Sequence, residues 1–240
     1  MQSFVSTEVS PQDGMRTPGE TLVRYLSVGQ DAIRSIKRAL DGRDPRSILD
    51  LPSGYGRVAR HLAFEYPEAQ LFVSDLDAEG AAFCARTFGA EPLPANADFD
   101  LCNFERRFEL IWAGSLVTHL PESATEAFLR FVARHLSPTG VGVITTHGDL
   151  AAGRIMGGHI WKHNVYGVPL PGEQAMLEEF FVTGYGFGDY PNRSGYGISL
   201  ASADWLGEAA SRNGLELVAH RPHAWDNHQD VMVVGLPPAE

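Results

Sequence analysis

Apolar and polar residues alternate along the chain with two different spacings, which predict helices and strands in turn. Residues 21–41 repeat apolar side chains every three or four positions, as an amphipathic helix does, and Gly42 ends this run. Short apolar runs bounded by turn residues or charges predict strands over 47–51, 71–75, 91–93, 108–114, 141–146, 215–220 and 230–235. Further helices are predicted over 57–66, 78–89, 121–136 and 203–213. Strands that alternate with such helices are typical of an α/β fold with a mostly parallel sheet and right-handed crossovers.

The regular alternation stops after His147. Between 151 and 200 the chain holds ten glycines and eight aromatic residues. An insertion of this length is usually a functional lid or a disordered segment, and its aromatic content argues against disorder. We predict an ordered segment that covers a binding site, with a homodimer interface as the alternative.

Composition narrows the class of partner. The chain has 240 residues with 19 Lys and Arg against 30 Asp and Glu, a net charge of −11. This balance argues against binding of a nucleic-acid backbone or of an anionic membrane surface. No apolar run approaches the roughly 20 residues that span a bilayer, the start lacks the pattern of a signal peptide, and two cysteines are too few for a disulfide framework. We therefore expect a single-domain cytoplasmic protein.

A glycine turn follows the first predicted strand. Gly54 and Gly56 allow a sharp turn that a ligand can approach at backbone distance, and Asp75 follows about 20 residues later at the end of the next strand. This spacing fits a dinucleotide site. However, Asp50 before the turn would repel a pyrophosphate and suits a ligand with an amino group and a sulfonium. The alternative is a tight structural turn in which the acids only cap local backbone.

Three runs resemble the motifs of class I S-adenosylmethionine-dependent methyltransferases. ILDLPSGYGRVARHL (48–62) is similar to their motif I, LFVSDLD (71–77) to the second motif, and FELIWAGSLVTHLPE (108–122) to the region of the fourth strand. Pro52 stands where the first motif commonly has glycine, and Glu109 where the family often has aspartate. The resemblance implies a doubly wound, Rossmann-like sheet of seven strands that ends in a C-terminal antiparallel hairpin. The expected parts are a lead-in and helix (1–42), a cofactor-binding half (43–150), an acceptor lid (151–200), and a closing helix and hairpin (201–240).

The resemblance also implies roles for residues. Asp50 and the backbone of the glycine turn would face the methionine part of S-adenosylmethionine, Asp75 would bind the ribose hydroxyls, and Leu76 would pack on the adenine. The full set implied for the cofactor is Asp50, Leu51, Pro52, Ser53, Gly54, Gly56, Asp75, Leu76, Asp98, Phe99, Trp112, Ala113 and Ser115.

The candidate general bases are histidines that follow the carboxyl ends of strands, because ligands bind at that edge of open α/β sheets. His119 and His147 follow the fourth and fifth predicted strands, and His228 lies in the polar run WDNHQD (225–230) before the last strand. That run is predicted either to cover the substrate or to form a hairpin turn at Asp226 and Asn227. Candidate acceptor contacts are Tyr185, Tyr190, Tyr196 and Trp225. His147, Asp149, His228 and Asp230 are potential metal ligands, but no tight ligand spacing supports a metal, and none is expected.

These observations predict a methyltransferase that uses S-adenosylmethionine and methylates a small-molecule acceptor, with oxygen as the expected atom. One alternative is a non-catalytic protein that binds S-adenosylmethionine. A second is an NAD-dependent oxidoreductase, which Asp50 and the lack of a second domain disfavour.

Overall fold

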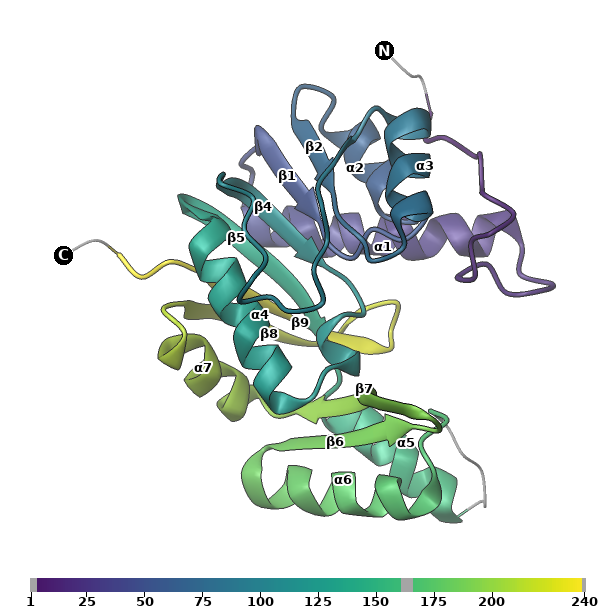
Figure 1. Cartoon of the computed structure of the whole chain (residues 1–240), viewed down its shortest axis with the longest axis vertical. Coiled ribbons are helices and arrows are strands. Elements are labelled where there is room, and N and C mark those ends of the chain that lie inside the picture. The colour runs from purple at the N-terminus through teal and green to yellow at the C-terminus, as the bar shows by residue number, and fades with distance from the viewer. Residues whose placement is uncertain (1–3, 161–165, 239–240) are drawn as a thin grey trace.

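The computed structural model describes residues 4–160 and 166–238, and its centre is a seven-stranded sheet (Figure 1). The strand order is β3-β2-β1-β4-β5-β9-β8. Strands β1 to β5 run parallel, whereas β9 is antiparallel to both of its neighbours, β5 and β8. The strands are β1 (Ser47–Asp50), β2 (Gln70–Val73), β3 (Glu91–Pro92), β4 (Phe108–Ala113), β5 (Leu136–Thr146), β8 (Glu216–Trp225) and β9 (Gln229–Gly235). The predicted fold class is confirmed, including the C-terminal antiparallel hairpin.

Helices cover both faces of the sheet. One apolar cluster joins one face to α1 (Leu22–Leu40), α2 (Ala59–Glu65) and α3 (Ala78–Phe88). A second cluster joins the other face to α4 (Glu122–His135) and α7 (Ala203–Arg212). Helix α1 shows why the spacing predicts this packing, because Val28, Ala32, Ile36 and Leu40 recur every four residues and are all buried.

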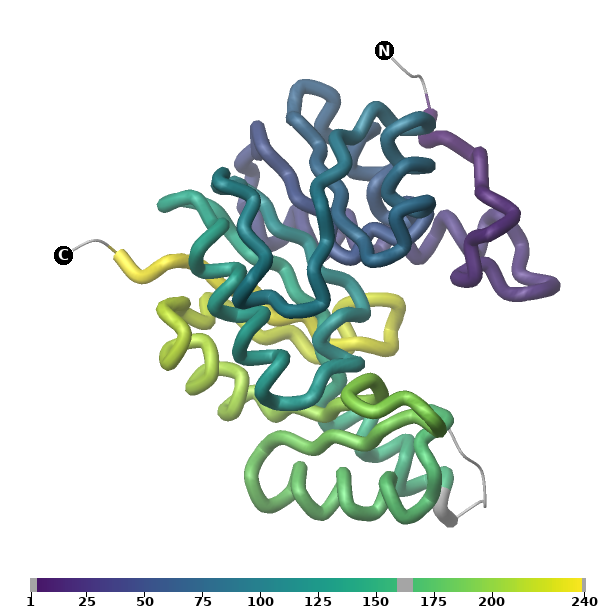
Figure 2. The backbone as a smooth tube through the Cα atoms, in the orientation of Figure 1, coloured from purple at the N-terminus to yellow at the C-terminus, as the bar shows by residue number. Residues whose placement is uncertain are grey.

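The segment after β5 forms a small lobe of its own. It contains α5 (Asp149–Ile160), α6 (Leu170–Thr183) and the antiparallel pair β6 (Tyr185–Tyr190) and β7 (Arg193–Ala201). Figure 2 shows the lobe beyond the end of β5, apart from the seven-stranded sheet. Its apolar cluster consists of Ala151, Ala152, Ile155, Val168, Met176, Leu177, Phe180, Ile198 and Leu200. Sequence analysis predicts no helices here, because glycines interrupt the helical pattern.

Two strands are longer than predicted. Strand β5 begins at Leu136 rather than at residue 141, and β8 continues to Trp225 rather than ending at residue 220. Both extensions contain Pro and polar residues, which weaken the strand pattern in the sequence. None of the described helices is long and apolar enough to cross a membrane.

Candidate functional site

The glycine turn (residues 51–57) leaves β1 and packs tightly against α3. Gly54 and Gly56 have φ angles of 50° and 78°, in the left-handed region that favours glycine. A Cβ atom on Gly56 would come within 2.3 Å of the Phe88 ring, and one on Gly80 in α3 within 2.6 Å of the Gly54 carbonyl oxygen. The glycines thus allow the backbone of the turn to lie in close contact with α3. Within it, the peptide bond from Leu51 to Pro52 is cis, and the amide of Ser53 donates to the carbonyl of Ser74.

Asp75 organises this turn from the end of β2. Its Oδ2 accepts a hydrogen bond from the amide of Gly54 at 2.7 Å, and its Oδ1 accepts one from the amide of Asp77 at 2.8 Å. A carboxylate has about four lone-pair sites, so the ribose hydroxyls can bind to the remaining ones. Leu76 beside it leaves 69% of its surface exposed, unusual for leucine and available to an adenine ring.

Asp50 lies at the base of the glycine turn and is 1% exposed. Burial, and next the negative charge of Asp75, raise the pKa of Asp50 well above its usual value, while the backbone of Ala59 acts in the opposite direction. Burial therefore favours the neutral form of this carboxyl group in the folded protein. Its Oδ2 has no hydrogen-bond partner among the described residues. A buried polar oxygen without a partner fits the amino group or sulfonium of S-adenosylmethionine, which would favour the charged form.

The other residues expected to contact the cofactor differ in how far their side chains are exposed to solvent. The Asp98 carboxylate is exposed and accepts from the amide of Asp100, whereas the Phe99 ring packs on Phe128 in the core, which leaves only its backbone for a ligand. Trp112 and Ala113 are buried as well.

Ser115 connects three strands at the sheet's carboxyl edge. It has a φ of 53°, its amide donates to Thr145 Oγ1 at 2.7 Å, and its hydroxyl accepts from Gln229 Nε2 at 2.9 Å. Gln229 was not predicted. Its only signal in the sequence is its place in the polar run that leads into β9.

His119 ends a 3-10 turn (Val117–His119) after β4, and its hydrogen bond determines its tautomer. Nδ1 lies 2.7 Å from the carbonyl oxygen of Gly197 in β7. A carbonyl only accepts, so Nδ1 carries the proton and Nε2 keeps a free lone pair. The ring stacks on Tyr196 with centroids 5.2 Å apart and lies 6.0 Å from Tyr190. Burial lowers the pKa of His119, opposed by the backbone of Gly197, so the ring is neutral at neutral pH.

His147 follows β5 and is 3% exposed. Its ring lies 5.5 Å from that of His228 and 5.1 Å from that of Tyr166. Neither ring nitrogen has a well-formed hydrogen bond to a described residue. Burial lowers the pKa of His147 to about 3, helped by His228 and His119 and opposed by the Ser199 backbone and Asp230.

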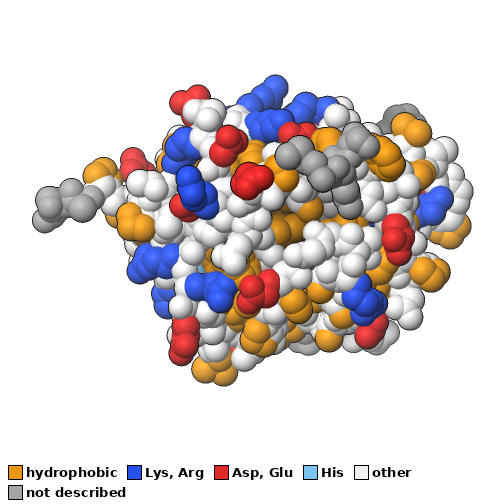
Figure 3. Space-filling model, turned by 90° about the horizontal axis from the view of Figure 1, so that it is seen from above, with side chains coloured by type: hydrophobic (Ala, Val, Ile, Leu, Met, Phe, Trp, Pro, Cys, Tyr) orange, Lys and Arg blue, Asp and Glu red, His pale blue; other side chains and the backbone are white. Residues whose placement is uncertain are grey.

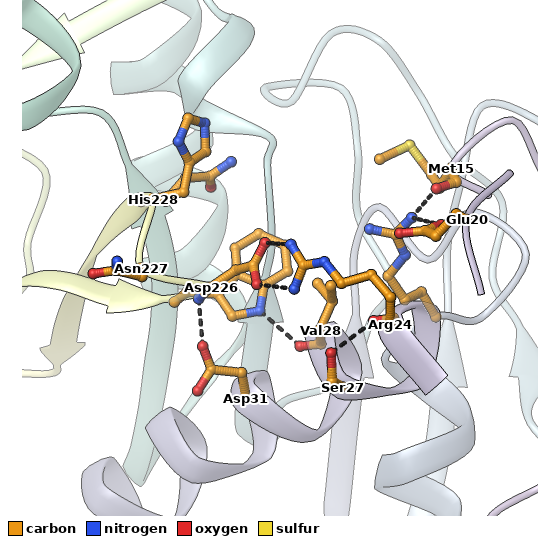
Figure 4. Close-up of polar contacts among 12 residues, drawn as sticks. Met15, Glu20, Arg24, Ser27, Val28, Asp31, Asp226, Asn227 and His228 are labelled. Atoms are coloured by element: carbon orange, nitrogen blue, oxygen red, sulfur yellow. Dashed lines mark hydrogen bonds and ion pairs between the residues drawn. The ribbon is translucent and has the colours of Figure 1, made fainter. Parts of the chain in front are cut away.

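The β8–β9 turn holds His228 in place by binding to α1. Asp226 and Asn227 both have positive φ angles, 53° and 50°, so the predicted hairpin turn is confirmed. The Asp226 carboxylate makes a bidentate ion pair with Arg24, and its amide donates to Asp31 (Figure 4). Figure 4 shows His228 on the side of this turn that faces away from α1.

The structure brings His119, His147 and His228 together; we call them the histidine centre. The charges of His119 and His228 both act on His147, and the lobe supplies Tyr166, Tyr190 and Tyr196 around them. Tyr166 was not predicted. Among the described residues, no group of three acidic, histidine or cysteine side chains is arranged to hold a metal ion.

Two predicted acceptor contacts instead lie in the core. Tyr185 is 1% exposed, and its hydroxyl bonds to the Leu120 carbonyl and to Thr125, both at 2.8 Å. Trp225 is 7% exposed and donates from Nε1 to the Val28 carbonyl. Tyr185 thus joins β6 to α4, and Trp225 joins β8 to α1.

Residues 48–140 match the methyltransferase domain family. No curated protein sequence matches the chain. The fold is similar to a TehB-like S-adenosylmethionine-dependent methyltransferase from Corynebacterium glutamicum, with 21% identity, a TM-score of 0.53, and 86% of this chain and 88% of that chain covered. It is also similar to an S-adenosylmethionine-dependent methyltransferase from Clostridium acetobutylicum, with 14% identity, a TM-score of 0.59, and 88% and 92% covered. A third similar structure is an O-methyltransferase family protein from Burkholderia thailandensis, with 14% identity, a TM-score of 0.60, and 91% and 58% covered.

The family match spans the glycine turn, Asp75 and the end of β4. Residues 48–140 therefore form a methyltransferase domain, and the chain has the fold that S-adenosylmethionine-dependent methyltransferases share.

Proposed function

We propose that the protein methylates a hydroxyl group of a small planar acceptor, with His119 as the general base. The observation that carries this proposal is the bond from His119 Nδ1 to Gly197, because it leaves Nε2 as a fixed proton acceptor after β4. Tyr190 and Tyr196 beside the ring offer flat apolar surface for the acceptor. The lobe then acts as the acceptor side of the site.

His147 is a weaker candidate for the base. A general base works best with a pKa near the operating pH, and His147, with a pKa of about 3, has little affinity for a proton. Its unpartnered nitrogens suit it instead to hydrogen-bond the acceptor.

One set of residues binds S-adenosylmethionine, and another binds and activates the acceptor. The glycine turn, Asp50, Asp75 and Leu76 hold S-adenosylmethionine, which supplies a methyl group on a cationic sulfur and leaves as a neutral thioether. His119 Nε2 accepts the proton of the acceptor hydroxyl, so the oxygen becomes the stronger nucleophile. Orientation of the two partners supplies the rest of the rate enhancement. The O-methyltransferase family protein among the similar structures agrees with an oxygen acceptor.

The test compares His119→Asn with the matched variant His223→Asn, which changes an exposed histidine. A panel of phenols and hydroxy acids is incubated with S-adenosylmethionine, and methylated products are identified by mass spectrometry. Asparagine still donates to the Gly197 carbonyl but cannot act as a base, so kcat is expected to fall by about 100-fold or more. Calorimetry is expected to show unchanged binding of S-adenosylmethionine. Unchanged kcat in His119→Asn, or products methylated only at nitrogen or carbon, would overturn the proposal.

A further inference from the structure

Arg154 of α5 approaches the histidine centre from the lobe and contacts a histidine. Its Nη1 lies against Nδ1 of His228, and its Nη2 donates to the Asn227 carbonyl at 3.4 Å. A guanidinium group only donates hydrogen bonds. Nδ1 of His228 is therefore the acceptor, and its proton sits on Nε2. Burial, and next the charge of Arg154, lower the pKa of His228 and keep the ring neutral.

This pairing gives Arg154 a neutral partner, and none of the described carboxylates forms an ion pair with it. Ion pairs elsewhere join arginines to carboxylates, as in Arg24–Asp226, Arg130–Asp100 and Arg212–Glu126. On the face drawn in Figure 3, basic and acidic side chains lie interspersed. Arg154 is partly buried, and no carboxylate within residues 4–160 and 166–238 forms an ion pair with it. A partly buried cation beside a neutral imidazole is a favourable place for an anion.

The neighbouring groups complete a site for a ligand oxygen. The Tyr166 ring lies beside that of His228, with centroids 5.7 Å apart and a tilt of 30°. Arg154 is close enough to oppose the rise that burial causes in the Tyr166 pKa. Beside both lies the buried His147, whose ring nitrogens have no well-formed hydrogen bond to a described residue. Arg154, Tyr166 and Nε2 of His228 all offer N–H or O–H donors. A set of donors with one positive charge matches a carboxylate, whereas a phosphate group carries about two negative charges at neutral pH.

We propose that Arg154, Tyr166 and His228 bind a carboxylate group of the acceptor. Together with the hydroxyl near His119, this makes the substrate class a hydroxylated aromatic carboxylic acid. The substrate class rests on the proposed function, but binding of the carboxylate is measurable without methyl transfer. His147 lies near both ends, because its ring is 5.5 Å from that of His228 and protonation of His119 would act on it.

The test uses calorimetry on protein saturated with S-adenosylhomocysteine. The probes are 2-, 3- and 4-hydroxybenzoate and their carboxamides, which keep the shape and remove the charge. At least one acid is expected to bind about tenfold or more tightly than its amide. Arg154→Gln should remove this preference and leave amide binding unchanged, while Arg154→Lys should restore part of it. Arg38→Gln, which removes the same charge from an exposed position of α1, should change neither affinity.

The outcomes separate this subsite from the proposed function. Equal affinity for acids and amides, no binding of any acid, or an unchanged preference in Arg154→Gln would each overturn the carboxylate subsite. Retained amide binding in Arg154→Gln shows that the variant is folded. If acid binding depends on Arg154 but His119→Asn still methylates at the normal rate, the subsite stands and the role of His119 falls. If amides are methylated as fast as acids, the subsite falls and methyl transfer to oxygen stands.

Discussion

The burial of His147 predicts a specific loss of stability in acid. Its pKa falls from the usual 6.5 to about 3 in the folded protein. Below pH 6.5 the unfolded chain binds a proton at this position while the folded chain does not, so acid favours unfolding. The contribution of His147 to stability is complete above pH 6.5 and declines as the pH falls toward 3. From these two pKa values the loss is about 2 kcal/mol at pH 5 relative to pH 8.

The assay is urea unfolding at pH 8 and pH 5 for the natural protein and for His147→Gln. Other buried histidines, such as His61 with a pKa lowered to about 4, contribute to both proteins and cancel in the comparison. The natural protein is therefore expected to lose about 2 kcal/mol more than the variant between the two pH values. The exposed His223→Asn variant should behave as the natural protein does. Equal losses in the natural protein and His147→Gln would refute the argument that His147 is held neutral by burial.

Two further predictions concern the glycine turn. Because the pKa of Asp50 is raised above the usual 3.8, ionisation destabilises the folded protein as the pH rises from that value. Asp50→Asn should thus melt at a higher temperature at pH 7 yet bind S-adenosylmethionine more weakly by calorimetry; a lower melting temperature would contradict this. Gly80→Ala places a Cβ atom 2.6 Å from the Gly54 carbonyl and should cost about 1–3 kcal/mol in urea unfolding, with weaker cofactor binding. Gly153→Ala, which meets no atom within 4 Å, is the matched control, and an equal effect of both would contradict the packing argument.

The sheet could be predicted from the sequence because each of its main strands has a recognisable pattern of apolar residues within a few positions. A strand that is buried on both faces reads as a short apolar run, as ILDL and FELIWA do, and the helices between them keep a periodic apolar face. The lobe lacks such signals. Its helices carry glycines and bury few residues each, so their structure depends on packing between α5, α6 and β7.

The histidine centre could be predicted in part. His119, His147 and His228 each adjoin a strand end, which marks them in the sequence. Arg154 and Tyr166 carry no such mark, because they reach the centre only when the lobe folds against β9. The raised pKa of Asp50 could not be predicted either, since it arises from burial and from Asp75 beyond the neighbouring strand.

The position of β9 has a consequence for the order in which the enzyme is assembled. Although it is the last strand of the chain, β9 lies inside the sheet between β5 and β8. During synthesis, the amino-terminal segments leave the ribosome first and begin to fold first. The glycine turn and Asp75 can therefore form while the sheet is still open at β5. His228 and Gln229 arrive with the final strand, so the nascent chain gains the glycine turn before the histidine centre. A ribosome that stalls before residue 228 would leave a chain with the cofactor turn but without a complete histidine centre.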